Sequence, residues 1–316
     1  MGKLVDGTWF DEGYDTAKSG GKFVRKDASF RDWITADGSS GFKAQPGRYH
    51  LYVSYACPWA HRALIFRSLK GLEEMISVSV VEPMMRENGW VLAAGEDPVN
   101  NAEFMHQIYT KANAAYTGRV TVPVLWDQEK AVIVNNESSE IIRMFNSAFD
   151  HLGAKPGDYY PPELRPQIDQ INDLIYPNIN NGVYRAGFAT TQSAYEEAFD
   201  QLFGALDQIE ERLSNQRYLV GNQITEADWR LFTTLVRFDS VYVGHFKCNR
   251  QQIGEYRNLS GYLRELYQVP GIAGTVNMDH IKSHYYTSHD SINPTGIVPI
   301  GPVNNLAQPH GRDHLG

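Results

Sequence analysis

The chain has 316 residues, a formal net charge of −8 at pH 7, and 21% charged residues. This length is sufficient for two packed domains, and the negative charge argues against nucleic acid or an anionic membrane as the partner. No apolar run approaches the roughly 20 residues that span a bilayer. The start of the chain lacks a signal pattern and the two cysteines form no motif, so we expect a cytoplasmic protein.

Residues 1–47 are rich in Gly, Asp, Lys and aromatic side chains but show no sustained hydrophobic period. We expect them to form an ordered extension that covers the first domain and is not a domain itself. Within it, residues 30–34 (FRDWI) favour a short helix or turn. The first regular domain is therefore expected to begin at residue 48.

The strongest local pattern lies at residues 48–70. Residues 50–56 are rich in β-formers and predict a buried strand, whereas the apolar spacing after Pro58 predicts an amphipathic helix. Proline is favoured in the first helical turn, because its missing N–H would have no partner there. Cys57 is therefore expected at a helix N-terminus, where backbone N–H groups and the helix dipole stabilise a thiolate.

The residues after Cys57 decide how it could react. His61 and Arg62 follow one turn later and could add positive potential. The third residue after the cysteine is Ala60 and not a second cysteine, so an oxidised Cys57 would need an outside thiol such as glutathione. The alternative is a buried structural cysteine, because cysteine is among the most buried residue types.

The segment from Tyr55 to Arg62, YACPWAHR, resembles the active-site segment of the glutathionyl-hydroquinone reductases, the Xi class of cysteine-type glutathione transferases. The resemblance extends from GGKFVR near the start to INPTGI and PHGRD near the end. It implies an α/β thioredoxin-like N-terminal domain and an all-α C-terminal domain, the glutathione transferase fold. It also implies glutathione as co-substrate and a homodimer.

Residues 76–82 predict a second strand, and the order strand, helix, strand implies a parallel βαβ unit. Residues 83–118 form an insertion with a helical piece around 104–111, and insertions of this kind often carry function. Trp90 in this insertion either closes over a ligand or covers the local core. We assign it to glutathione binding.

Residues 119–126 predict a strand that contains Pro123. In the resembled fold a cis proline lies here and faces the cysteine. Val122 would then present its backbone N–H and C=O to glutathione, as one strand does to another. Arg119 and Val120 are assigned to glutathione binding with it.

Residues 131–135 predict a last short strand, and a helix follows from about Ser138. Ser138 and its neighbours are good N-cap types, and a helix start favours an anion. By resemblance, Glu137 takes the ammonium of the γ-glutamyl group of glutathione and Ser138 takes its carboxylate. An ordinary capped helix is the alternative, and the two are compatible.

The Gly/Pro-rich stretch 151–160 predicts a linker, which makes residues 48–150 the thioredoxin-like glutathione-binding domain. Residues 161–284 are expected to be all-helical, with Thr225 and Asp228 forming a capping box. Residues 285–316 show no period and predict a coil tail, unless they are tied down over the domains. The expected helices of the second domain cover residues 168–179, 194–213, 259–267 and 272–284 and a segment from Glu226.

Three of the 18 tyrosines lie in segments that resemble the family closely: Tyr184, Tyr242 and Tyr285. The resemblance places them in the pocket over the cysteine, where a phenol can stack on a ring and donate to a hydroxyl. Taken alone, each would be expected in the core. We assign all three to substrate binding and assign Tyr184 and Tyr285 also to catalysis.

The predicted reaction is the glutathione-dependent reduction of a glutathionyl-hydroquinone through a mixed disulfide between Cys57 and glutathione. The pairs His280/His284 and His245/Cys248 have no further ligand at a known spacing, so no metal is expected. One alternative function is a general glutathione thioltransferase or dehydroascorbate reductase. The other is a non-catalytic glutathione-fold binding protein.

Overall fold

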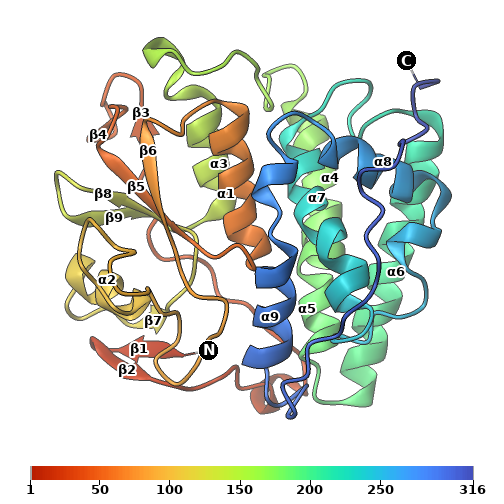
Figure 1. Cartoon of the computed structure of the whole chain (residues 1–316), viewed down its shortest axis with the longest axis horizontal. Helices are drawn as coiled ribbons and strands as arrows, with labels where there is room; N and C mark the ends of the chain where they lie inside the picture. The colour runs from red at the N-terminus through yellow and green to blue at the C-terminus, as the bar shows by residue number, and fades with distance from the viewer. Residues whose placement is uncertain (1, 316) are drawn as a thin grey trace. The chain divides into compact units, whose positions relative to one another are not determined.

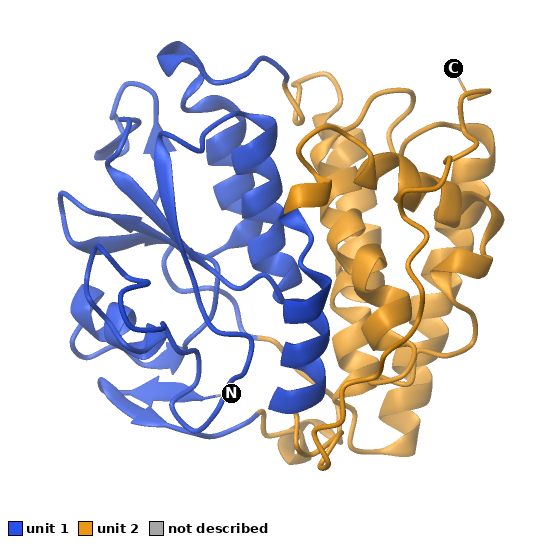
Figure 2. Ribbon diagram, in the orientation of Figure 1, with its two compact units in different colours: residues 1–13, 26–157, 275–288 blue, residues 14–25, 158–274, 289–316 orange. Residues whose placement is uncertain are grey.

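The computed structural model of the chain describes residues 2–315 and is drawn in Figure 1. The contacts among its residues divide the chain into two compact units, each built from three segments (Figure 2). Unit 1 comprises residues 1–13, 26–157 and 275–288, and unit 2 comprises residues 14–25, 158–274 and 289–316. The sequence instead predicted continuous domains at 48–150 and 161–284, and these limits remain predictions.

The centre of unit 1 is a four-stranded sheet in the order β6-β5-β8-β9. Strand β5 runs parallel to β6 and antiparallel to β8, and β8 runs antiparallel to β9. Helices α1 and α3 pack against each other, and α2 packs against β9 (Figure 1). The predicted thioredoxin-like arrangement is confirmed, with elements β5 (Tyr49–Val53), α1 (Pro58–Leu69), β6 (Ile76–Val80), α2 (Met105–Ala112), β8 (Val124–Asp127), β9 (Val132–Asn135) and α3 (Ser138–Ser147).

The N-terminal extension contains short strands that pair with this unit. Strand β1 pairs antiparallel with β2 and with β7. The prediction of a helix or turn at residues 30–34 is wrong, because Arg31 forms a bridge with Asn135 and the N–H of Asp32 donates to the carbonyl of Val134 (3.0 Å). The short strands are β1 (Lys3–Val5), β2 (Thr8–Phe10), β3 (Ile34–Thr35), β4 (Phe42–Lys43) and β7 (Gly118–Arg119).

The strand predicted over residues 119–126 is divided in two. Its start belongs to β7 and its end to β8, and the cis peptide bond between Val122 and Pro123 lies between them. The divided segment turns from the small β2-β1-β7 sheet into the central sheet.

Unit 2 is helical. Thr225 and Asp228 form the predicted capping box, in which the N–H of Thr225 donates to Oδ2 of Asp228 (2.8 Å). Its helices are α4 (Arg165–Ile175), α5 (Gly182–Gly187), α6 (Gln192–Asn215), α7 (Glu226–Arg237) and α8 (Arg257–Tyr267), with single π-helical turns at Tyr176–Asn180 and Phe238–Tyr242. The chain also forms short 3-10 turns at Ala17–Ser19, Asp150–Leu152, Ile253–Glu255 and Ala273–Thr275.

The helix predicted from Ile272 begins later than expected. Residues Ala273–Thr275 form a 3-10 turn, and helix α9 covers Met278–Ser288. Helix α9 belongs to unit 1, although it follows the helices of unit 2 in the sequence (Figure 2). Among the described residues, no helix is long and apolar enough to cross a membrane.

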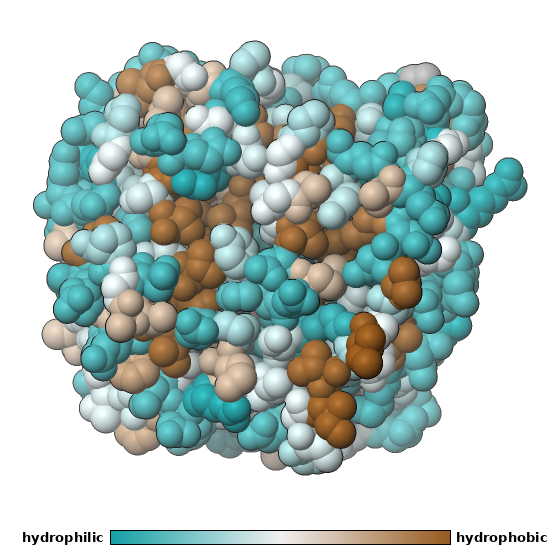
Figure 3. Space-filling view, viewed as in Figure 1, coloured by the Kyte–Doolittle hydropathy of each residue, from teal (hydrophilic) through white to brown (hydrophobic). Residues whose placement is uncertain are grey.

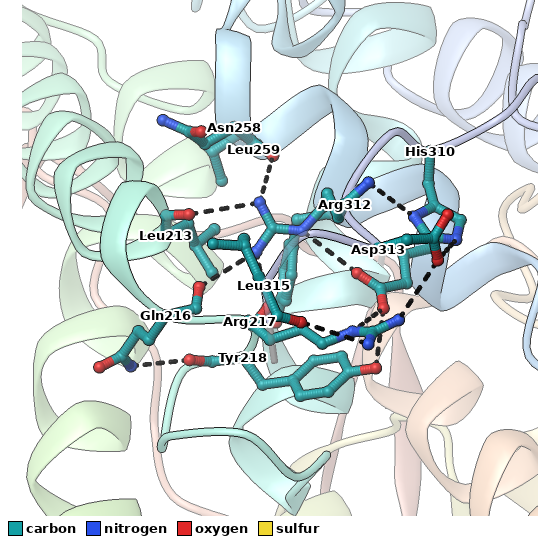
Figure 4. A network of polar contacts seen from close by, with 12 residues as sticks. Leu213, Gln216, Arg217, Tyr218, Asn258, Leu259, His310, Arg312, Asp313 and Leu315 are labelled. Atoms are coloured by element: carbon teal, nitrogen blue, oxygen red, sulfur yellow. Dashed lines mark hydrogen bonds and ion pairs between the residues drawn. The ribbon is translucent and has the colours of Figure 1, made fainter.

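The segment after α9 has no helix or strand through residue 315 and is tied to unit 2. The guanidinium of Arg312 is buried and donates to the carboxylate of Glu265 at 3.2 Å (Figure 4). It also donates to the carbonyls of Leu213, Gln216, Arg217 and Asn258. Other parts of this tail are exposed, including Ile300 and Val303. Apolar side chains are visible in several patches on the face of the molecule drawn in Figure 3.

Candidate active site

Cys57 lies between a buried strand and a helix. Strand β5 ends at Val53 and α1 begins at Pro58, so Cys57 is the N-cap residue of α1. Its carbonyl accepts the first helical hydrogen bond from the N–H of His61 (3.0 Å), but its side chain makes no capping bond. The half-buried thiol instead donates to the carbonyl of Val122, with Sγ 3.4 Å from the oxygen. The thiol of Cys57 therefore lies at the N-terminus of a helix, where the sequence predicted it.

The backbone of Val122 lies beside this thiol. Val122 precedes the cis Pro123 and belongs to no strand, and its side chain is buried. Among residues 2–315, no group accepts a hydrogen bond from the N–H of Val122. A donor and an acceptor on one residue beside the thiol are what an extended peptide ligand requires.

Arg119 and Val120 lie just before this segment. Val120 is buried. The guanidinium of Arg119 donates to the carbonyls of Glu12 and Gly13 in the extension. Arg119 therefore fastens the extension to unit 1, and its role in glutathione binding remains a prediction.

The start of α3 forms a second polar corner in unit 1. Glu137 is the N-cap residue, and its carboxylate accepts from the N–H (2.9 Å) and the hydroxyl (2.8 Å) of Ser139. Ser138 is the first helical residue and is buried. Its hydroxyl accepts from the guanidinium of Arg62 at 3.3 Å. The corner thus offers a carboxylate and a hydroxyl on consecutive residues.

The buried hydroxyl of Tyr109 fixes the segment before Pro123 relative to the start of α3. It donates to the carbonyl of Thr121 (2.9 Å) and accepts from the side-chain amide of Asn136 (3.1 Å). Desolvation raises the pKa of Tyr109 to about 12, so the hydroxyl keeps its proton at neutral pH.

Trp90 is buried and packs against helix α9. Its ring stacks on that of His284 with 4.7 Å between centroids and an interplanar angle of 22°. Nδ1 of His284 is 2.8 Å from the carbonyl oxygen of Pro83, and the hydroxyl of Ser288 accepts from the N–H of Met85 (2.9 Å). Helix α9 therefore holds the start of the 83–118 insertion, and it also carries the buried Tyr285.

Tyr184 and Tyr242 lie together in unit 2, with ring centroids 6.2 Å apart. The ring of Phe246 is 5.5 Å from each of them. Tyr242 is fully buried, whereas Tyr184 is half-buried, with the guanidinium of Arg25 5.1 Å from its ring centroid. The structure thus brings two of the three predicted substrate tyrosines into one aromatic cluster.

His61 and Cys248, which the sequence also singled out, contact other parts of the protein. Nε2 of His61 lies 2.8 Å from the hydroxyl of Thr275. Cys248 is fully buried, and desolvation raises the pKa of its thiol well above the ordinary range. Among residues 2–315 there is no group of three or more His, Cys, Asp or Glu side chains that could hold a metal ion.

Two family models match the chain: "Glutathione S-transferase, N-terminal domain" over residues 56–148 and "Glutathione S-transferase, C-terminal domain" over residues 192–265. Glutathionyl-hydroquinone reductase YqjG of Escherichia coli K12 is 59% identical, with 99% of each chain covered. A structure of the Xi class GST from Natrialba magadii is 51% identical and has a TM-score of 0.93, covering 100% of this chain and 97% of that one. This chain belongs to the Xi class of glutathione S-transferases.

Further relatives of this Xi-class transferase support the same assignment. Glutathionyl-hydroquinone reductase PcpF of Sphingobium chlorophenolicum is 58% identical over 97% of this chain and 98% of that protein. The glutathione-bound structure of E. coli YqjG is 56% identical, with a TM-score of 0.91 and 99% of each chain covered. The resemblance predicted from the sequence is therefore confirmed at the level of family and fold.

The sequence did not predict that Tyr109 bonds to the segment before Pro123 or that His284 stacks on Trp90. Tyr109 lies in a helical piece without a motif, and its partners come from two other segments. The one available signal for His284 was its position directly before Tyr285.

Proposed function

We propose that this chain reduces glutathionyl-hydroquinones with glutathione as co-substrate. The Cys57 thiolate attacks the glutathionyl sulfur, a disulfide forms between Cys57 and glutathione, and the carbon–sulfur bond of the conjugate breaks. The aromatic carbon keeps the bonding electron pair and takes a proton, which releases the hydroquinone. A second glutathione thiolate then attacks the mixed disulfide, which releases oxidised glutathione and restores the Cys57 thiolate.

The observation that carries this proposal is the position of Cys57. It lies at the N-terminus of α1, beside the backbone of Val122, and is followed three residues later by Ala60. A thiol without a second cysteine in its motif suits a cycle in which an outside thiol resolves the mixed disulfide. The names of the E. coli and Sphingobium relatives supply the substrate class.

The remaining predicted residues have these proposed roles. The backbone of Val122 pairs with the cysteinyl part of glutathione, Glu137 binds the γ-glutamyl ammonium, and Ser138 binds the carboxylate. Trp90, Arg119 and Val120 complete the glutathione site. Tyr184 and Tyr285 assist the departure of the hydroquinone by hydrogen bonding or proton donation, and Tyr242 lines the substrate site. The protein is proposed to act as a homodimer in the cytoplasm.

The test is to mix the protein with a glutathione conjugate of 1,4-hydroquinone, with and without free glutathione. Chromatography measures released hydroquinone, and mass spectrometry of acid-trapped protein identifies the modified cysteine. Hydroquinone release with glutathione attached to Cys57 is expected. Release without that adduct contradicts the covalent mechanism, and absence of both contradicts the enzyme assignment.

A general glutathione thioltransferase has the same cysteine requirement, since a monothiol also suits simple mixed disulfides. The comparison that separates the two is the kcat/KM for the hydroquinone conjugate against that for a mixed disulfide of glutathione and cysteamine. Faster turnover of the conjugate is expected. The reverse order would replace the proposed substrate class with small disulfides.

A further inference from the structure

Arg62 lies on α1, five residues after Cys57, and its guanidinium does not face solvent. Only 1% of the residue is exposed, because α1 packs against α3. The guanidinium donates to the Ser138 hydroxyl at 3.3 Å and lies 4.5 Å from the ring centroid of Trp59. A positive charge is thus held beneath the first residue of α3.

At the start of α3 a negative charge and a positive charge lie beside consecutive residues. Glu137 places a carboxylate at the N-cap of α3, and Arg62 places a guanidinium against the next residue, Ser138. The γ-glutamyl group of glutathione carries an ammonium and a carboxylate on one carbon atom. If the ammonium meets Glu137, the carboxylate meets Ser138 on the side where Arg62 lies. A charge in such a buried place acts through a low dielectric and is screened weakly.

We propose that Arg62 is a further determinant of glutathione binding, because its buried guanidinium selects ligands that carry the γ-glutamyl carboxylate, both by orienting the Ser138 hydroxyl and by its own positive charge. The proposal rests on the proposed function, since it assigns a residue to the same glutathione site. Arg62 is a positioning residue that orients the Ser138 hydroxyl and adds positive potential at the carboxylate. A purely structural Arg62 would tie α1 to α3 without affecting ligand choice.

The experiment measures binding of two unreactive ligands by calorimetry: S-methylglutathione and its analogue that lacks the γ-glutamyl carboxylate, 4-aminobutanoyl-S-methylcysteinylglycine. The unaltered protein is expected to bind S-methylglutathione about tenfold to a hundredfold more tightly than the analogue. This is the ratio of dissociation constants that corresponds to the loss of one charge-assisted hydrogen bond. In Arg62→Met this preference is expected to fall to about threefold or less. Arg62→Lys keeps a charge and is expected to retain more of the preference than Arg62→Met.

Arg67→Met is the matched control on the same helix. The guanidinium of Arg67 donates to the backbone carbonyls of Ile76 (2.7 Å) and Glu73 (3.0 Å) and to no group of α3 among the described residues. Its removal is expected to lower stability and leave the ligand preference unchanged. A preference in Arg62→Met equal to that of the unaltered protein would overturn the proposal, and so would equal preferences in the lysine and methionine variants.

Ser138→Ala keeps the test decisive if Arg62→Met does not fold. With Arg62 intact, the positive charge persists, so a preference of at least about threefold for the carboxylate is expected to remain. Equal binding of the two ligands by Ser138→Ala would show that the hydroxyl alone recognises the carboxylate, and it would overturn the proposal. Failure of the unaltered protein to bind S-methylglutathione would instead contradict the glutathione site itself, which separates the two failures.

Discussion

Two helix N-termini of unit 1 satisfy their first backbone N–H groups differently. At α3 the N-cap residue is Glu137, whose carboxylate accepts the N–H of Ser139. At α1 the N-cap residue is Cys57, whose side chain makes no capping bond. The first four N–H groups of any helix lack intrahelical acceptors, so both ends favour negative charge.

The N-cap of α3 contributes to the stability of its helix, whereas the N-cap of α1 carries the thiol of the proposed reaction. The carboxylate of Glu137 already stabilises its own helix, and in the proposed function it also binds the ammonium of glutathione. The thiol of Cys57 contributes little to its helix, so the field of the α1 terminus is available to a thiolate. Substitutions at the two N-caps should therefore change different measurable quantities.

The largest expected effect is the loss of turnover in Cys57→Ala. Hydroquinone release should fall by at least about a thousandfold, because the covalent step has no other nucleophile. The free energy of unfolding should change by less than about 0.5 kcal/mol, because no capping bond is lost. Cys248→Ala is the control and should keep its turnover, since that thiol is buried and protonated. Activity of Cys57→Ala near that of the parent would show that the N-cap of α1 does not supply the nucleophile.

The next effect concerns the strands that precede the two helices. Strand β5, before Cys57, contains buried His50, whose ring nitrogens lie 2.7 Å from the hydroxyl of Ser77 and 2.9 Å from that of Ser79. Strand β9, before Glu137, has no titratable side chain. Desolvation lowers the pKa of His50 from 6.5 to about 4, so the folded protein keeps this ring neutral at pH values where the unfolded chain binds a proton.

The free energy of unfolding should therefore fall as the pH decreases from about 6.5 to about 4, with up to about 3 kcal/mol of this loss due to His50. Above pH 6.5 the residue is neutral in both states and contributes no pH dependence. Urea unfolding of the parent and of His50→Phe between pH 4 and 8 measures the difference. The variant should show the weaker pH dependence, and identical curves would exclude His50 as the cause.

Glu137→Ala should have a moderate effect on both stability and binding. Loss of the N-cap carboxylate should lower the free energy of unfolding by about 1 kcal/mol. It should also raise the dissociation constant of S-methylglutathione about tenfold, because the ammonium loses its anionic partner. Glu74→Ala removes an exposed carboxylate of the same unit and should change neither quantity. A stability loss as small as that of Cys57→Ala would remove the difference between the two N-caps.

The smallest effect is expected at the ion pair between the extension and the first turn of α3. Nε of Arg31 lies 2.7 Å from Oε2 of Glu140, but 46% of the Arg31 side chain is exposed. Arg31→Ala should therefore lower the free energy of unfolding by less than about 1 kcal/mol. The loss should shrink further in 1 M salt, where surface charges are screened. A larger, salt-independent loss would mean that the extension supports α3 through other contacts.

The parts that the sequence predicted well depend on local signals. A β-rich run followed by Cys57 and Pro58 defines a strand–helix junction without reference to distant residues. The capping box of Thr225 and Asp228 is likewise contained within four residues. The family resemblance then supplied the order of the domains and the cis bond before Pro123, which propensity alone does not determine.

The parts that the sequence did not predict depend on distant partners. Residues 30–34 are extended because Arg31 and Asp32 bond to strand β9, about 100 residues away. Helix α9 buries Ile281, His284 and Tyr285, but its local sequence does not reveal that His284 contacts Trp90 in unit 1. The burial of Arg62 depends on the packing of α1 against α3, whereas its charge alone would suggest a surface position.

The segmented construction of the two units has a consequence for biosynthesis. Unit 1 includes residues 275–288, and unit 2 is fastened by Arg312, so each unit needs residues that the ribosome adds late. Domains commonly fold in order as they emerge during translation, the N-terminal one first. Here neither unit has all of its own chain until residues beyond 274 have left the exit tunnel. The packing of each unit is therefore completed only after segments that are distant in the sequence have been synthesised, which couples the last steps of folding of the two units in time.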